Sequence, residues 1–152
     1  MTAKEYLSQA YKLDKQADMI LQKAAAMRNS LYGRGQNGES GKPAPSRDSL
    51  AKAITKVVDY ERKADELIDR LVDMRIEIEN AISEVPDPIQ REVLERRYLL
   101  YQSWDGYYDT ETGDYIKGIY ERMKCSRRQM FRYYNEGLKF IENMALNGIE
   151  WH

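Results

Sequence analysis

The residues best suited to binding a charged partner gather between Ser126 and Asn135. They carry three guanidinium groups, two carboxamides and one hydroxyl, and they are Ser126, Arg127, Arg128, Gln129, Arg132 and Asn135. A guanidinium donates several N–H groups in a planar fork, which suits phosphate oxygens and the edge of guanine. A serine before a helix can accept a bond from a free backbone N–H, and a glutamine three residues later can bond back. The stretch therefore predicts a helix that begins at Ser126 and presents arginines to a polyanion such as duplex DNA.

The apolar residues around this stretch predict how the helix is held. The expected buried stripe consists of Met130, Tyr133 or Tyr134, Leu138 and Ile141. Upstream, Ile119 and Met123 lie one helical turn apart, and Lys124 and Cys125 offer a break between two helices;. Residues 115–141 thus predict a short helix, a tight turn and a longer helix, which is the layout of a helix-turn-helix.

The local charge supports a polyanionic partner. Residues 115–142 hold seven Lys or Arg against three Glu, whereas residues 86–114 hold three Arg against seven acids. Attraction to phosphate acts within about 8–10 Å in salt, so this local balance is a better guide than the net charge of −1;. The cations expected to hold the DNA backbone are Lys117, Arg122, Lys124 and Lys139.

Other chemistry finds little support in the sequence. The chain has one histidine, His152, and one cysteine, Cys125, so neither a nucleophile–histidine pair in the interior nor a zinc site with three or four ligands is expected;. No Gly-rich phosphate loop occurs. We therefore expect no enzyme activity, no cofactor and no metal. The absence of an apolar run near 18 residues and of an apolar signal core, together with a single cysteine, predicts a cytoplasmic protein with no membrane contact;.

Two heptad patterns predict long helices in the N-terminal half. The first, expected over residues 2–33, consists of Tyr6, Ala10, Leu13, Ala17, Ile20, Ala24, Met27 and Leu31. The second, expected over 48–84, consists of Ala53, Val57, Tyr60, Ala64, Leu67, Leu71, Met74, Ile78, Ala81 and Val85, and Ser46 or Asp48 is the expected cap. Glycine and proline predict a mobile loop at 33–47. The two seams predict an antiparallel helical hairpin over 1–85.

Additional apolar residues widen the second stripe. They are Ile54, Ile68, Val72 and Ile82. This width exceeds what one facing helix covers, so the hairpin is expected to pack on the C-terminal part or on a second subunit.

A C-terminal domain is expected over residues 86–152. Asp87 and Pro88 are typical of a helix start, Gln90 would complete a capping box, and the helix is expected to run to Trp104;. The acidic insertion 105–114 predicts a small hairpin or ordered loop that faces away from DNA, after which Tyr115 and Ile116 open the next helix. The last helix is expected to end near Leu146, before Asn147–Gly148 and an apolar tail that contains Trp151.

The C-terminal third resembles the last DNA-binding region of bacterial sigma factors. Ile119, Met123, Ser126 and the pair Gln129–Met130 fill the places of its consensus string. Tyr120 stands where that region has a small alanine, and Lys124 where it often has glycine. The string REVLERRYL, residues 91–99, resembles the helix that precedes the helix-turn-helix in such proteins.

The whole arrangement resembles a family of small phage and prophage proteins, which includes the ArpU and RinA types of late-gene transcription regulator. The resemblance rests on Arg91–Leu94, Arg96–Tyr98, Trp104 and residues 119–141. It implies a sequence-specific transcription regulator that places Arg127, Arg128, Arg132, Gln129 and Asn135 in the major groove. A single unit of this size reads few base pairs, so a homodimer joined through the helical arm is expected.

The predicted fold is therefore all-α, with a long N-terminal antiparallel hairpin followed by a helix-turn-helix domain. Two further functions fit the same pattern. One is a phage DNA-packaging protein, because small terminase subunits also join a helix-turn-helix to long helices, as rings. The other is a helical module that binds RNA polymerase or a host protein, with the helix-turn-helix as scaffold.

Overall fold

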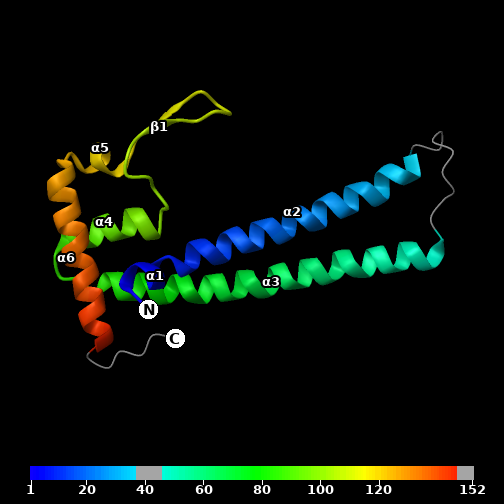
Figure 1. The fold of residues 1–152 in the computed structure, drawn as a ribbon, viewed down its shortest axis with the longest axis horizontal. Helices are drawn as coiled ribbons and strands as arrows, with labels where there is room; N and C mark the ends of the chain where they lie inside the picture. Colours follow the sequence, from blue (N-terminus) through cyan, green and yellow to red (C-terminus); the bar gives the residue numbers. More distant parts are fainter. Residues whose placement is uncertain (37–45, 147–152) are drawn as a thin grey trace. The chain divides into compact units, whose positions relative to one another are not determined.

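The computed structural model describes residues 1–36 and 46–146, and it confirms the predominantly helical class (Figure 1). In chain order the elements are α1 Ala3–Leu7, α2 Gln9–Gln36, α3 Arg47–Ser83, α4 Pro88–Tyr98, β1 Tyr107–Tyr108, β2 Tyr115–Ile116, α5 Ile119–Met123 and α6 Arg127–Leu146. The chain forms two compact units: the first joins Met1–Tyr11 to Asp73–His152, and the second is Lys12–Val72. The boundary predicted at residue 85 therefore lies inside the first unit. No helix in the described ranges is long and apolar enough to cross a membrane.

The single N-terminal helix predicted over 2–33 is interrupted at Ser8 and ends later than predicted. Thr2 and Glu5 form a capping box that starts α1, and Ser8 ends it after five residues. The Ser8 hydroxyl and backbone N–H both donate to the carbonyl of Lys4, at 2.6 and 3.0 Å. The hydroxyl bond alone does not explain the break, because Thr55 makes the same bond to the Ala51 carbonyl inside α3, and α3 continues through it. At its other end α2 continues to Gln36, three residues beyond the predicted stop.

In the second unit, α2 and α3 run side by side in opposite directions (Figure 1). Each residue of the two predicted seams that lies in this unit is buried or half-buried, and Ala17, Ala24 and Ala64 are at most 3% exposed. Small side chains at these positions allow two helices to approach closely. The Arg28 guanidinium binds the Glu61 carboxylate across the helices at 2.7 Å and lowers its pKa. Ser46 caps α3, since its hydroxyl accepts from the N–H of Ser49.

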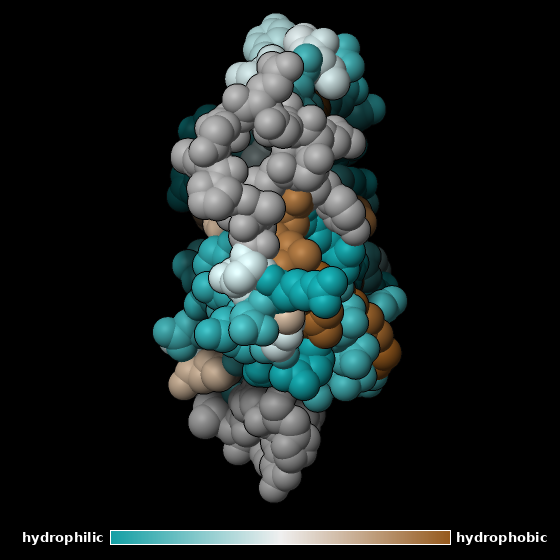
Figure 2. Space-filling model, turned by 90° about the vertical axis from the view of Figure 1, so that its right-hand side faces the viewer, coloured by the Kyte–Doolittle hydropathy of each residue, from teal (hydrophilic) through white to brown (hydrophobic). Residues whose placement is uncertain are grey.

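Apolar side chains remain exposed on α3 in this unit. Ile54, Val58 and Val72 are each about half exposed, at 50–52%, and Ile68 is 37% exposed. On the face seen in Figure 2, apolar patches interrupt a largely hydrophilic surface. Of the residues predicted to widen the seam, only Ile82 is buried, and it lies in the first unit.

Helix α4 begins as predicted and ends earlier. The Asp87 carboxylate accepts from the N–H groups of Ile89 and Gln90. The Gln90 side chain does not complete the predicted capping box but donates to Glu136 at 2.8 Å. The helix stops at Tyr98 rather than at Trp104, and Tyr101 turns the chain with a φ of 55°.

The acidic segment forms a β-hairpin, one of the two predicted alternatives. Strands β1 and β2 pair antiparallel, with Tyr107 opposite Ile116 and Tyr108 opposite Tyr115. Gly113 takes a φ of 75° in the connecting turn, a conformation that glycine adopts without steric cost;. The prediction that Tyr115 and Ile116 open a helix is therefore wrong. Their aromatic and β-branched side chains pair well across two strands.

The core of the first unit places α6 against α4. From α4 it contains Val93, Leu94 and Tyr98, and from α6 it contains Met130, Tyr134, Leu138 and Ile141. The hydroxyls of Tyr98 and Tyr134 share a hydrogen bond of 2.6 Å inside this core. A side chain at Gly137 would place its Cβ 3.0 Å from Leu94 Cδ1, so glycine allows the two helices to pack closely here.

The start of α5 is tied to the segment that follows α4. Gly118 precedes α5 and provides no capping side chain. Instead, the N–H groups of Ile119 and Tyr120 donate to the carbonyls of Ser103 and Trp104, at 2.9 and 3.3 Å. A Cβ at Gly118 would overlap the Trp104 carbonyl oxygen and lie 2.7 Å from the backbone nitrogen of Gly106. Because Gly118 has no side chain, the two backbone segments can touch. The carbonyls of residues 103 and 104 then accept bonds from the free N–H groups at the start of α5.

We predict that Gly118→Ala lowers the free energy of unfolding by about 1–3 kcal/mol, because the backbone of residues 104–106 must move and lengthen its bonds to α5. Urea titration followed by circular dichroism measures this change. Gly106→Ala is the matched control, since its added methyl group meets the outer ends of Tyr115 and Glu121, which can rotate away. Equal stability of the two variants would contradict the proposed close approach.

Candidate nucleic-acid interface

The chain passes from α5 to α6 through a tight turn. Lys124 ends α5 in the left-handed conformation, with φ 53° and ψ 39°. Glycine is the usual residue in this conformation. Lys124 stands at the position where the sigma-factor region often has glycine. The Ser126 hydroxyl then accepts from the backbone N–H of Gln129 at 3.2 Å, which confirms the predicted cap of α6. Two consecutive local features thus fix where α6 begins.

One face of α6 is buried and the opposite face is polar. The buried face consists of Met130, Tyr134, Gly137, Leu138 and Ile141. The opposite face consists of Arg128, Arg132, Asn135 and Lys139, all of them exposed. These four positions are separated by four, three and four residues, so they form one stripe about 16 Å long at a rise of 1.5 Å per residue. We call this set the α6 stripe.

The α6 stripe carries positive charge without internal compensation. Within the described ranges, neither Arg128 nor Arg132 forms an ion pair with a carboxylate. The Arg132 guanidinium lies over its neighbour Tyr133, 5.4 Å from the ring centre. The nearby acid of α6, Glu136, accepts a bond from Gln90 of α4 and lies beside the stripe rather than on it. Both guanidinium groups therefore keep N–H donors available for a partner.

Arg127 has a different environment from the one predicted. Its guanidinium binds the Asp105 carboxylate at 2.8 Å and lies over the ring of Tyr120, 5.4 Å from its centre. Consecutive residues of an α-helix lie about 100° apart around the helix axis, so Arg127 does not share the face of Arg128 and lies off the stripe. Asp105, the first residue of the acidic insertion, therefore lies beside one of the arginines predicted to bind DNA. Both partners stay mostly exposed, with side-chain exposures of 72% and 63%.

The remaining predicted residues lie beside the stripe. Lys117, Arg122 and Lys124 are exposed before, on and directly after α5, and Arg122 Nε donates to the Lys117 carbonyl at 3.1 Å. Ser126 uses its hydroxyl as the cap, and Gln129 is exposed in the first turn of α6. Of the predicted residues, Arg128, Arg132, Asn135 and Lys139 thus share one exposed face of α6, and Arg127 does not belong to it.

An aromatic cluster supports α5 and α6, and the sequence analysis did not identify it. Trp104 contacts Tyr120 of α5 and two residues of α6, Phe131 and Tyr134, with ring centres 5.9, 5.6 and 4.9 Å away. Tyr120, read from the sequence as too large for the position of a small alanine, instead packs at the edge of this cluster. Burial raises the pKa of the Tyr120 hydroxyl. The only sequence signal for the cluster is the large aromatic residue at each of these positions.

The turn cysteine shows no sign of a reactive site. Cys125 is half-buried, and its thiol donates to the Met123 carbonyl at 3.4 Å. The residues that the structure describes contain no group of three or more side chains able to hold a metal ion.

Comparison with known proteins does not assign the chain to a family. No family model matches it, and searches of curated proteins and of solved structures returned no significant match. The resemblance to phage regulators noted in the sequence stays a prediction, and function must be inferred from the geometry of α5 and α6.

Proposed function

We propose that the chain binds duplex DNA through α6 and acts as a transcription regulator. One observation carries the proposal: the α6 stripe places Arg128, Arg132, Asn135 and Lys139 on a single exposed face, opposite the face that α4 buries. No carboxylate in the described part of the chain neutralises the two arginines.

The shape of the two helices suits the major groove. With side chains, an α-helix is about 10–12 Å across, and the major groove of B-DNA is about 12 Å wide. If α5, the Lys124 turn and α6 act as a helix-turn-helix, α6 is the helix that enters the groove. Arginine pairs with the O6 and N7 of guanine and asparagine with adenine, so Arg128, Arg132 and Asn135 are the residues that read bases.

The flanking cations would fix the position of the protein on the backbone. Lys117, Arg122 and Lys124 are exposed in the segment that precedes α6, and Lys139 belongs to the stripe. Contacts of this kind orient a protein on DNA without reading its sequence, and each one steepens the salt dependence of binding. Two copies of the chain, each with one α6, would reach two half-sites, so we propose a homodimer as the active form. Regulation of phage genes of the ArpU and RinA type is the role that the sequence resemblance suggests.

We predict that the double variant Arg128→Glu, Arg132→Glu lowers affinity for duplex DNA at least 100-fold. Each reversal removes a base or phosphate contact, worth about 1–3 kcal/mol for a good bidentate pair, and adds repulsion. Fluorescence anisotropy at 150 mM salt, with duplexes selected by the wild-type protein from random sequence, measures the effect. Arg62→Glu is the control, because Arg62 is an exposed α3 residue of the other unit. Unchanged affinity of a folded double variant would contradict the proposal.

We predict that Asp105→Asn strengthens binding several-fold. The Asp105 carboxylate neutralises Arg127 in the resting protein, and its removal frees that guanidinium for a phosphate. The slope of log affinity against log salt should therefore become steeper by about one unit. Asp59→Asn is a matched control, because Asp59 is also an exposed acid paired with an arginine, at 3.4 Å, but in the other unit. Equal effects of the two variants would show that only the net charge matters.

A further inference from the structure

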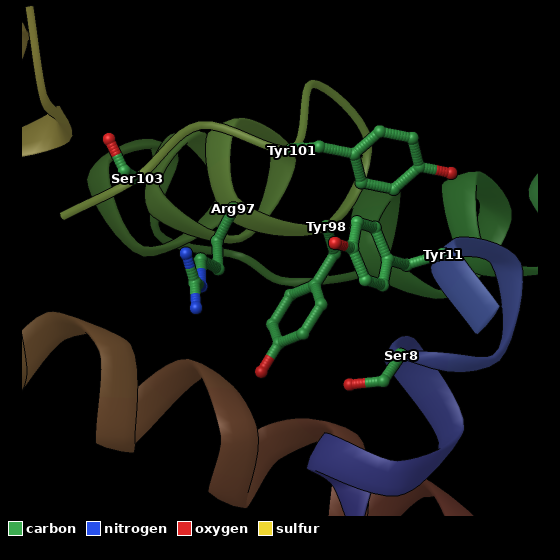
Figure 3. A pocket seen from close by; sticks show the side chains of 6 residues that line it. All are labelled: Ser8, Tyr11, Arg97, Tyr98, Tyr101 and Ser103. Carbon is green, nitrogen blue, oxygen red and sulfur yellow. The ribbon is translucent and has the colours of Figure 1, made fainter. Parts of the chain in front are cut away.

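A small hollow lies in the first unit, away from the α6 stripe (Figure 3). It encloses about 260 Å³ and is lined by Ser8, Tyr11, Arg97, Tyr98, Tyr101 and Ser103. Three segments meet there: the junction of α1 and α2, the end of α4, and the irregular segment that follows α4. Two of these are the places where the helices break off contrary to the sequence pattern, at Ser8 and after Tyr98.

The walls are mostly aromatic. Tyr11 and Tyr101 pack edge to face with ring centres 5.4 Å apart, and the Arg75 guanidinium lies 5.7 Å from the centre of the Tyr101 ring. Tyr101 holds a left-handed backbone with φ 55°, which is a costly conformation for a bulky residue;. Strain of this kind is kept only where the surroundings fix it, and it is frequent at ligand sites.

Arg97 supplies the one positive charge of the lining. Its guanidinium donates to the Gln102 carbonyl at 3.0 Å and lies over Trp104, 5.2 Å from the ring centroid. No carboxylate of the described residues pairs with it, whereas the adjacent Arg96 is bound to Glu92 at 3.1 Å. Arg97 is half-buried, so its charge is partly removed from water without a protein counter-charge;.

A second donor faces the same space. In Figure 3 the Arg97 guanidinium and the Tyr98 hydroxyl lie on one side of the hollow, and the rings of Tyr11 and Tyr101 lie on the other. The Tyr98 hydroxyl shares its bond with Tyr134, and when Tyr134 donates, the Tyr98 proton is available to a ligand;. Burial and this bond raise the pKa of Tyr98, so the hydroxyl keeps its proton at neutral pH, while the charge of Arg97 acts in the opposite direction.

We propose that this hollow binds a small aromatic anion, a single planar ring that carries a carboxylate or a phosphate. The tyrosine rings would hold the ring of the ligand, and Arg97 with Tyr98 would bind its anionic group. A neutral ligand would leave Arg97 without a counter-charge, and an anion without a ring would leave the aromatic walls unused. The volume is below the 300–1,000 Å³ that is usual for drug-sized ligands, which restricts the ligand to about one ring. The proposal stands independently of DNA binding.

The test uses the full chain and four probes followed by ligand-observed NMR. The anions with a ring are 4-hydroxybenzoate and phenyl phosphate; 4-hydroxybenzamide lacks the charge and inorganic phosphate lacks the ring. We expect at least one ring anion to bind, and both controls to bind at least tenfold more weakly. Arg97→Gln should weaken binding of the ring anions about tenfold, and Arg97→Lys should weaken it less. Arg96→Gln is the matched control at the preceding residue and should leave this binding unchanged.

A second variant covers the case in which Arg97→Gln does not fold. Tyr11 is 46% exposed at the rim of the hollow, so Tyr11→Leu removes a wall while the fold is kept. Tyr11→Leu should weaken the binding of the ring anions and leave the binding of inorganic phosphate unchanged. Failure of both ring anions to bind would overturn the proposal. Equal binding of inorganic phosphate and phenyl phosphate, or equal binding of ring anions to wild type and Tyr11→Leu, would also overturn it.

Discussion

The approach of the backbone near Trp104 to Gly118 is the constraint on which the arrangement of α5 and α6 depends. The carbonyls of Ser103 and Trp104 take the place of a helix cap for α5, and no side chain at residue 118 would fit beneath them. This contact fixes α5, and the left-handed Lys124 then fixes the direction of α6. Trp104 itself packs against α5 and α6 from the same position. One short segment thus holds both helices.

The exposure of the α6 stripe follows from the packing of the opposite face. Because α4 and α1 pack on α6 and the face with Met130, Tyr134, Leu138 and Ile141 is buried, a helix of 3.6 residues per turn must turn Arg128 and Arg132 outward;. The ion pair beside the start of α6 is one that a binding partner can replace. The Arg127–Asp105 pair is mostly exposed, and exposed pairs contribute at most about 1 kcal/mol;. A phosphate could therefore take the place of Asp105 at little cost.

Sequence reasoning succeeded where the signal is local. The Asp87 and Ser126 caps, the break at Lys124, and the buried and exposed positions of α6 all depend on residues within a few positions of each other. It failed where contacts between residues far apart in the sequence determine the local structure. Tyr115 fits a helix as well as a strand until Tyr108 pairs with it, and Arg127 joins the outer face until Asp105 is brought beside it. The heptad pattern continues through the break at Ser8 and does not reveal it, and the Trp104 cluster joins residues up to 30 positions apart.

The most direct measurement of the central claim is an NMR titration of the protein with duplex DNA, followed at the arginine side-chain Nε–H signals. These report each guanidinium separately. The signals of Arg128 and Arg132 should shift or broaden at stoichiometric DNA, while that of Arg62 in the other unit stays in place. Tight DNA binding with the Arg128 and Arg132 signals unmoved would contradict the claim that α6 enters the groove.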